Sequence, residues 1–242
     1  MVVYGINPVR EALRAGRVRT LRVGGRGGDR VRELLALAQA RGLAVQQVTP
    51  DVLDRLARGG VHQGVVADVE DVSIDYSVDE LVRGSGGAPL LVVLDGIEDP
   101  HNLGAILRTV DAAGAGGVIV QSRRSAALGG AAAKASAGAS AHVRIAQVVN
   151  IARAIDELKE AGVWTIGLAG EAPTSYEAID LTLPSAIVLG AEGAGLRRLV
   201  RERCDHLAAI PIQGHVGSLN VSVAAGIVLF EAVRQRRLKS SV

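Results

Sequence analysis

Three segments of the sequence place glycines and polar side chains directly after short apolar runs. The apolar runs read as strands, and open α/β sheets bind ligands at the carboxyl ends of their strands. These segments are therefore the candidate sites of chemistry, and they cover residues 94–104, 188–196 and 210–222.

The first segment reads Leu-Asp-Gly-Ile-Glu-Asp-Pro-His-Asn-Leu-Gly and runs into a helix that carries Arg108. Its acidic residues and Asn102 are also typical of turns and helix caps. Asn102 and Arg108 are six residues apart, which is roughly 1.7 turns of a helix, so a regular helix places them on different faces. The two side chains can converge only if Asn102 lies at the start of the helix.

The second segment surrounds one carboxylate, Glu192, with Gly190, Gly193 and Gly195. Glycines let the backbone approach a ligand closely, and the helix that follows offers unpaired amides. The order Gly-x-x-Gly-x-Gly differs from the Gly-x-Gly-x-x-Gly of dinucleotide sites, and no acidic residue follows about 20 residues later. Residues 95–99 lack that fingerprint as well. Both absences argue against a nucleotide-dependent oxidoreductase.

The third segment links the last expected strand to the last expected helix and contains Ser218 and Asn220. It is consistent with a ligand-binding loop. It is equally consistent with a plain loop in which Ser218 caps the helix. On this segment alone both interpretations stay open.

The larger part of the chain alternates short apolar strands with helical stretches, which predicts a mostly parallel sheet covered on both faces. The alanine-rich stretch 126–141 is interpreted as a buried helix because alanine is the strongest helix former. Strands are expected at residues 90–94, 118–120, 164–168, 187–189 and 208–212, and helices at 103–113, 129–138, 148–161, 196–203 and 219–236.

Residues 1–72 predict a separate, smaller α/β domain. A polar and glycine-rich stretch follows, and we expect a linker at residues 73–88. A second domain then covers residues 89–242, since 242 residues exceed one average domain. In the small domain, helices are expected at residues 7–15, 29–40 and 50–57, and strands at 20–23, 44–48 and 64–69.

The composition, with 48% hydrophobic and 21% charged residues, indicates a folded globular protein. The single cysteine, Cys204, excludes an internal disulfide framework and a cysteine-based metal site, and we expect no metal. The first residues do not form the basic and apolar regions of a signal peptide, so a cytoplasmic location is expected. No apolar run approaches the roughly 20 residues that span a bilayer, so no membrane insertion is expected.

Arginine dominates the basic residues, since only Lys134, Lys159 and Lys239 are lysines among 27. Arginine suits bidentate phosphate contacts, which favours RNA or another anionic ligand, although a GC-rich genome also enriches arginine. Eight arginines and two acids lie between residues 10 and 32, so the small domain is expected to present a basic face. With one Phe, one Trp and three Tyr, base-stacking platforms are missing, and RNA binding must use charge, shape and backbone amides.

In order and spacing the three segments resemble the SpoU (TrmH) branch of the SPOUT RNA methyltransferases, over essentially the whole chain. Residues 4–13, 61–64 and 231–236 further resemble the bacterial 23S rRNA guanosine-2′-O-methyltransferases, which have a small L30e-like RNA-binding domain. The stretches that match the three SpoU motifs are Asn102-x-Gly104-x-x-x-Arg108, residues 189–193, and residues 210–212 with 218–222.

The resemblance implies an L30e-like domain followed by a domain whose chain threads a deep trefoil knot, a rare topology. It implies S-adenosylmethionine as cofactor, methyl transfer to a ribose 2′-hydroxyl of RNA, most simply 23S rRNA, and a homodimer with the site near the interface. The residues whose main-chain groups would hold the cofactor are Leu189, Gly190, Gly193, Ile210, Ile212, Ser218 and Leu219. Those implied to contact RNA are Asn7, Arg10, His62, Gln63 and Arg108.

Methyl transfer from a sulfonium to a hydroxyl is an in-line displacement, in which positioning alone is worth about 7–11 kcal/mol. The resemblance makes Arg108 catalytic, because a guanidinium can hold the target phosphate and favour a developing alkoxide. Arg108 does not suit the role of general base, because an arginine pKa lies above about 12. Glu192 could orient Arg108 or cap the following helix. Asn102, Ser218 and Asn220 could position substrate or shape the knot.

The RNA target and the activity itself leave alternatives. The same chemistry on tRNA or another rRNA site stays open, because RNA recognition uses surfaces formed only in three dimensions. A non-catalytic RNA-binding or assembly protein should have lost motif residues, whereas all five of those named for catalysis are present. Ser140-Ala141-His142 departs from related sequences, which often carry an acidic residue there.

Overall fold

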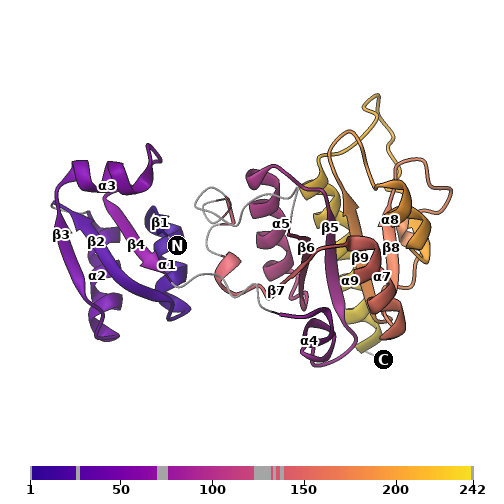
Figure 1. The fold of residues 1–242 in the computed structure, drawn as a ribbon, viewed down its shortest axis with the longest axis horizontal. Helices are drawn as coiled ribbons and strands as arrows, with labels where there is room; N and C mark the ends of the chain where they lie inside the picture. Colours follow the sequence, from indigo (N-terminus) through magenta and orange to yellow (C-terminus); the bar gives the residue numbers. More distant parts are fainter. Residues whose placement is uncertain are drawn as a thin grey trace.

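The computed structural model describes residues 2–25, 28–69, 76–122, 132, 135, 136 and 139–240. It contains two β-sheets (Figure 1), and each sheet has its own hydrophobic packing. The predicted α/β class, with a small N-terminal and a larger C-terminal domain, is confirmed. Most of the helix expected at residues 129–138 lies outside the described residues.

The N-terminal domain is a mixed four-stranded sheet with the strand order β1–β4–β2–β3. Strand β4 is antiparallel to both of its neighbours, whereas β2 and β3 are parallel. Its elements are β1 (Val2–Tyr4), α1 (Ile6–Arg14), β2 (Val18–Gly24), α2 (Asp29–Ala40), β3 (Val45–Val48), α3 (Pro50–Ala57) and β4 (Val65–Val69). The sequence does not predict β1, because three residues are too short to show a period.

The C-terminal domain is a six-stranded sheet with the order β10–β8–β9–β5–β6–β7, and every neighbouring pair is parallel. The carboxyl ends of all six strands therefore lie at one edge. Asp95 and Gly190 are paired at the ends of β5 and β9, which brings the first two candidate segments side by side. The strands are β5 (Leu90–Asp95), β6 (Gly117–Gln121), β7 (Ile145–Val148), β8 (Trp164–Leu168), β9 (Ser185–Gly190) and β10 (His206–Ala208).

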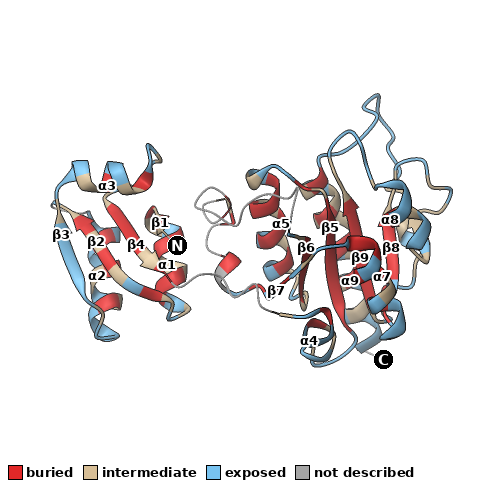
Figure 2. Ribbon diagram, viewed as in Figure 1, coloured by how far each residue is buried: buried red, intermediate tan, exposed pale blue. Residues whose placement is uncertain are grey.

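Helices cover both faces of this sheet, as the sequence predicts. Figure 2 shows the central strands as buried, and β5 explains why: Val92 and Leu94 face one apolar cluster while Leu91 and Val93 face the other. A strand buried on both faces reads as a continuous apolar run. One face carries α5 (Pro100–Ala112) and α9 (Val221–Ser240), and the other carries α4 (Val78–Arg83), α7 (Ile151–Glu160) and α8 (Arg198–Arg203).

The segment expected as a linker, residues 73–88, contains the helix α4. A capping box starts this helix, since the Ser77 and Glu80 side chains each accept from the other's backbone N–H. Leu81 is fully buried in the same apolar cluster as α7. Residues 78–83 are therefore part of the second domain, and the linker prediction is wrong for them.

Two more elements of the second domain differ from the prediction. Strand β7 was absent from it, because its four residues alternate too briefly to give a signal. The strand expected at residues 208–212 ends at Ala208, so Ile210 and Ile212 lie in the loop beyond it. Both isoleucines therefore belong to the loop of the third candidate segment and not to the sheet.

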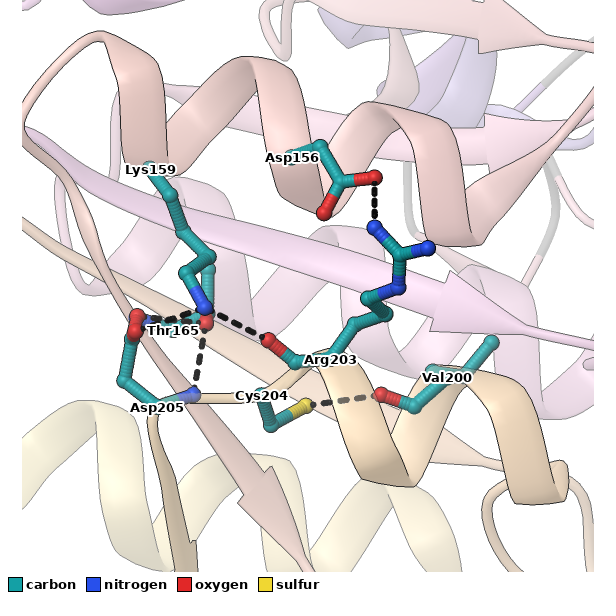
Figure 3. A network of polar contacts seen from close by, with 7 residues as sticks. All are labelled: Asp156, Lys159, Thr165, Val200, Arg203, Cys204 and Asp205. Atoms are coloured by element: carbon teal, nitrogen blue, oxygen red, sulfur yellow. Dashed lines mark hydrogen bonds and ion pairs between the residues drawn. The ribbon is translucent and has the colours of Figure 1, made fainter.

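A polar network ties β8 to the residues that follow α8 (Figure 3). The backbone N–H and the hydroxyl of Thr165 donate to Asp205 at 2.9 and 2.8 Å, and Lys159 Nζ lies 2.9 Å from the same carboxylate. Burial raises the pKa of Asp205, but the hydrogen bonds from Thr165 and Lys159 outweigh it, and the pKa lies below its ordinary value. Burial also raises the pKa of Cys204 to about 12, so this thiol stays protonated at neutral pH and is not a nucleophile.

Candidate active site

A cavity of about 740 Å³ opens at the carboxyl edge of the six-stranded sheet. Its volume is typical of small-molecule and cofactor sites, which span about 300–1,000 Å³. The second and third candidate segments line it together with the end of β8. The lining includes all seven residues predicted to hold the cofactor: Leu189, Gly190, Gly193, Ile210, Ile212, Ser218 and Leu219.

The loop after β9 is a tight turn that only glycines can form. Ala191 and Gly195 exchange two backbone hydrogen bonds of 3.1 and 2.8 Å. Gly193 and Gly195 have φ angles of +73° and +65°, in the left-handed region that favours glycine. A Cβ atom on Gly190 would collide with the backbone of Gly195. The glycines therefore shape the cavity wall, where the peptide groups themselves border the cavity.

One polar residue from each candidate segment meets the others beside this cavity. Glu192 Oε1 accepts a hydrogen bond from Asn102 Nδ2 at 2.8 Å and another from Asn220 Nδ2 at 3.0 Å. Asn220 Nδ2 also lies 3.0 Å from Asn102 Oδ1. Asn102 is only 7% exposed and lies in the first turn of α5. The three residues thus join the first turn of α5, the loop after β9 and the residue before α9 in one network.

Asn220 has a second contact that positions the last helix. Its Oδ1 accepts from the Ser222 backbone N–H at 2.9 Å and from the Ser222 hydroxyl at 2.5 Å. Helix α9 begins at Val221, so Asn220 is its N-cap. The interpretation in which Ser218 caps this helix is therefore wrong, and Ser218 lines the cavity instead.

Arg108 lies further along α5 and is exposed to solvent, unlike Asn102. The two residues therefore lie on different faces, as a regular helix requires, although Asn102 is near the helix start. Glu192 does not orient Arg108, because its contacts go to the two asparagines. Among the described arginines of the C-terminal domain, Arg108 alone has no hydrogen bond or ion pair.

The end of β8 and its neighbour on α8 were not predicted from the sequence as part of the site. Leu168, Gly170 and Glu171 line the cavity, and Glu171 forms an ion pair with Arg201 at its rim. The sequence does contain a signal for this part of the cavity, because a glycine and a carboxylate follow the apolar run 164–168, as in the three candidate segments. Arg201 could not be found from the sequence, because it lies inside a helix.

The residues predicted to contact RNA in the small domain gather around the start of α1. Asn7 is exposed, and its Oδ1 accepts from Arg10 at 3.1 Å. Gln63 Oε1 accepts from the backbone N–H of Ile6 at 2.9 Å, which satisfies a free donor at the helix start. His62 is within hydrogen-bond distance of Asp54, at 3.1 Å. The structure thus brings the two predicted stretches together, and each of these residues also has a structural contact.

Part of the expected basic face of the small domain is neutralised by ion pairs. Most of its described arginines have a partner, while three exposed arginines, one in α2 and two at the end of α3, have none among the described residues. The ion pairs are Arg10 and Arg14 with Glu11, Arg22 with Asp68 and Arg32 with Asp29, and the unpaired arginines are Arg30, Arg55 and Arg58.

The stretch that departs from related sequences lies near α1. Ser140 is buried and within 3.3 Å of the Ser136 hydroxyl. His142 is exposed, and its Nε2 lies 3.9 Å from a carboxylate oxygen of Glu11. Across the described residues, no group of three or more His, Cys, Asp or Glu side chains is placed to hold a metal ion. No helix in the described part of the chain is both long and apolar enough to cross a membrane.

Comparison with known proteins gives the family. Residues 89–230 match the SpoU rRNA Methylase family, and residues 2–74 match the RNA 2'-O ribose methyltransferase substrate binding family. The chain therefore belongs to the SpoU methylases that carry an N-terminal substrate-binding domain.

Similar proteins share this organisation over their full length. The 23S rRNA (guanosine-2'-O-)-methyltransferase RlmB of Pseudomonas syringae pv. tomato is 46% identical, over 98% of this chain and 96% of the relative. The RlmB of Yersinia pestis is 46% identical, over 99% of each chain. The crystal structure of the SpoU methyltransferase AviRb from Streptomyces viridochromogenes in complex with AdoMet superposes with a TM-score of 0.80 at 30% identity, covering 98% of this chain and 91% of that one.

Proposed function

We propose that this chain transfers a methyl group from S-adenosylmethionine to the ribose 2′-hydroxyl of a guanosine in 23S rRNA. The observation that carries the proposal is the meeting of Asn102, Glu192 and Asn220 beside the 740 Å³ cavity. Relatives named for this reaction match nearly the whole chain, which supports the ribosomal target. Such a substrate implies a cytoplasmic enzyme.

S-adenosylmethionine fits the cavity in size and in lining. Peptide groups of the glycine loop border the cavity because Gly190 has no room for a side chain. Apolar side chains such as Leu189, Ile210 and Leu219 complete the wall, and this mixture suits a ligand with an aromatic base and a polar tail. When bound, the cofactor supplies a methyl group made electrophilic by its sulfonium. The knotted threading of this domain stays a prediction from the resemblance.

Arg108 is the residue that we assign to the RNA. Its guanidinium has no partner among the described residues, so it is available to a phosphate. A cation beside the target 2′-oxygen favours the negative charge that develops there as the proton leaves. Asn102, Glu192 and Asn220 hold the ends of the three motifs in place, and Ser218 borders the cofactor site. Asn7, Arg10, His62 and Gln63 form the proposed RNA surface of the small domain.

We also propose that two copies pair through α9. Val223, Phe230 and Leu238 are exposed apolar residues spaced seven and eight positions apart, which places them along one side of the helix. Three exposed apolar side chains on one side of a helix favour an association site, although the exposed Arg234 lies between two of them. Helix α9 packs against α5, which carries Arg108, so a dimer formed there would place the RNA site near the interface.

The test is methyl transfer by the purified chain with radiolabelled S-adenosylmethionine and separate 23S rRNA, 16S rRNA and tRNA transcripts. Mapping of hydrolysis-resistant linkages then identifies the methylated ribose. We expect methylation at a single guanosine of 23S rRNA. Transfer only to tRNA would show that the substrate is tRNA and not 23S rRNA. Cofactor binding without transfer to any RNA would favour a non-catalytic RNA-binding protein.

A further inference from the structure

A fully buried carboxylate lies where the first motif leaves the sheet. Asp95 ends β5 and is 0% exposed. Its oxygens accept from the backbone N–H of Arg197 at 2.9 Å and from Arg197 Nε at 2.6 Å, and a terminal nitrogen of the same guanidinium also contacts it. A carboxylate out of water is costly unless it is paired and hydrogen-bonded, so Asp95 strongly constrains where Arg197 can lie.

The pair joins the two ends of the glycine loop. Gly190, where the loop begins, is the register partner of Asp95 in the β5–β9 ladder. Arg197, which directly follows the cavity-lining residues, is fixed by the Asp95 side chain. Its guanidinium also donates to Gln121 Oε1 at 2.9 Å, at the end of β6. The loop is thereby attached to two neighbouring strands at the point where it leaves the cavity.

Between its ends the loop has few constraints of its own. Residues 192–195 are exposed, and two of them are glycines with positive φ. Glycines lose more conformational freedom on ordering than other residues, so the loop is costly to order. The Ala191–Gly195 turn and the Glu192 network hold the middle of the loop, and Leu196 at its end packs against the apolar cluster that contains α7.

We infer that Asp95 and Arg197 are positioning residues that hold the glycine loop in its cofactor-binding shape. This inference rests on the proposed function, because it assigns the loop to S-adenosylmethionine. Neither residue lines the cavity, so both act on the cofactor through the backbone of the loop. The pair therefore governs cofactor affinity more than the methyl-transfer step.

The test uses the full chain with Arg197→Ala, Arg197→Lys and the matched control Arg198→Ala. Arg198 is the neighbouring arginine, is exposed, and pairs with Glu202 within α8. We expect Arg197→Ala to raise both the Kd and the KM for S-adenosylmethionine at least about tenfold, the loss typical of one hydrogen bond to a charged group. The kcat at saturating cofactor should stay within about threefold, and Arg198→Ala should leave KM within about twofold.

Hydrogen exchange of the cofactor-free protein gives a readout that a general loss of stability would not reproduce. We expect the amides of residues 191–196 to exchange at least about tenfold faster in Arg197→Ala, while those of β5 and β9 keep their protection. Uniform loss of protection would overturn the inference, as would a KM equal to that of the control variant. Should Arg197→Ala not fold, Arg197→Lys keeps a cation without the fork, and a wild-type KM in that variant overturns the inference. Failure of the wild-type chain to bind S-adenosylmethionine would instead refute the proposed function, and the exchange comparison would still test the loop attachment.

Discussion

Replacing Arg108 by alanine separates RNA chemistry from cofactor binding. The side chain is exposed and has no partner in the described part of the chain, so its removal breaks no contact of the fold. Surface substitutions of this kind change the free energy of unfolding by no more than about 0.5 kcal/mol. For a chain of this length, that corresponds to a Tm shift of about 1–2 °C.

We expect Arg108→Ala to lower the rate of methyl transfer. Removing one donor that stabilises developing charge lowers kcat by about 10²–10³. Arg108 does not line the cavity, so the Kd for S-adenosylmethionine should stay within about threefold of wild type. Arg108→Lys should recover little activity, because an ammonium does not reproduce the forked guanidinium contact.

Single-turnover methyl transfer to 23S rRNA at saturating cofactor measures the rate of the methyl-transfer step. Calorimetry measures the Kd for S-adenosylmethionine, and thermal unfolding measures the Tm. Arg153→Ala is the matched control, since Arg153 is an exposed arginine of α7 on the opposite face, paired with Glu157. Near-normal turnover of the Arg108→Ala variant would refute the reasoning. So would a loss of activity that follows a loss of cofactor binding or of dimerisation, because Arg108 would then be structural.

Three further changes test other parts of the molecule. Gly190→Ala puts a Cβ against the backbone of Gly195. Calorimetry should therefore show at least about tenfold weaker S-adenosylmethionine binding, and the free energy of unfolding should fall by about 1–3 kcal/mol. Wild-type affinity would contradict the loop geometry. Arg55→Ala and Arg58→Ala remove unpaired cations, so each should reduce the slope of log K against log salt for an rRNA fragment by about 0.7–0.9, and unchanged slopes would place the RNA elsewhere. The pKa of Asp205 is lowered, so its stabilising effect is present above its unfolded pKa of about 3.9 and is lost as the pH falls further. Asp205→Asn should therefore flatten the decline of unfolding free energy below about pH 4, and an unaltered decline would count against the network.

Sequence periodicity predicted the long buried elements and missed three of the short ones. Strand β5 was predictable because it is apolar on both faces, and the sheet-edge rule then brought the candidate segments to one place. Strands β1 and β7 and helix α4 have three, four and six residues. Segments this short show at most two periods, so their structure depends on the partners that they meet in the fold.

The contacts within the site could not be predicted from the sequence, for a different reason. Asn102 and Glu192 are 90 positions apart, and Asn220 lies a further 28 positions along. Residue types and motif order identified all three, but only the packing decides which carboxylate meets which donor. Glu192 was assigned to Arg108 or to a helix cap, and instead it joins the two asparagines. For Asp95 the sequence left open a site residue or a turn residue, and its pairing with Arg197 depends on a loop 102 residues away.

Helix α5 links the two parts of the proposed site, because Asn102 in its first turn contacts the glycine loop and Arg108 further along is assigned to the RNA. Its first turn is fixed by the Asp99 cap, whose side chain accepts from the His101 backbone N–H at 2.9 Å, and by the contact between Asn102 and Glu192. The contacts that hold the glycine loop therefore also set where Arg108 lies relative to the cavity. A change at Glu192 must disturb cofactor and RNA positioning together, whereas a change at Arg108 disturbs only the RNA side. That asymmetry follows from the geometry of one helix and does not depend on where the proton of the 2′-hydroxyl goes.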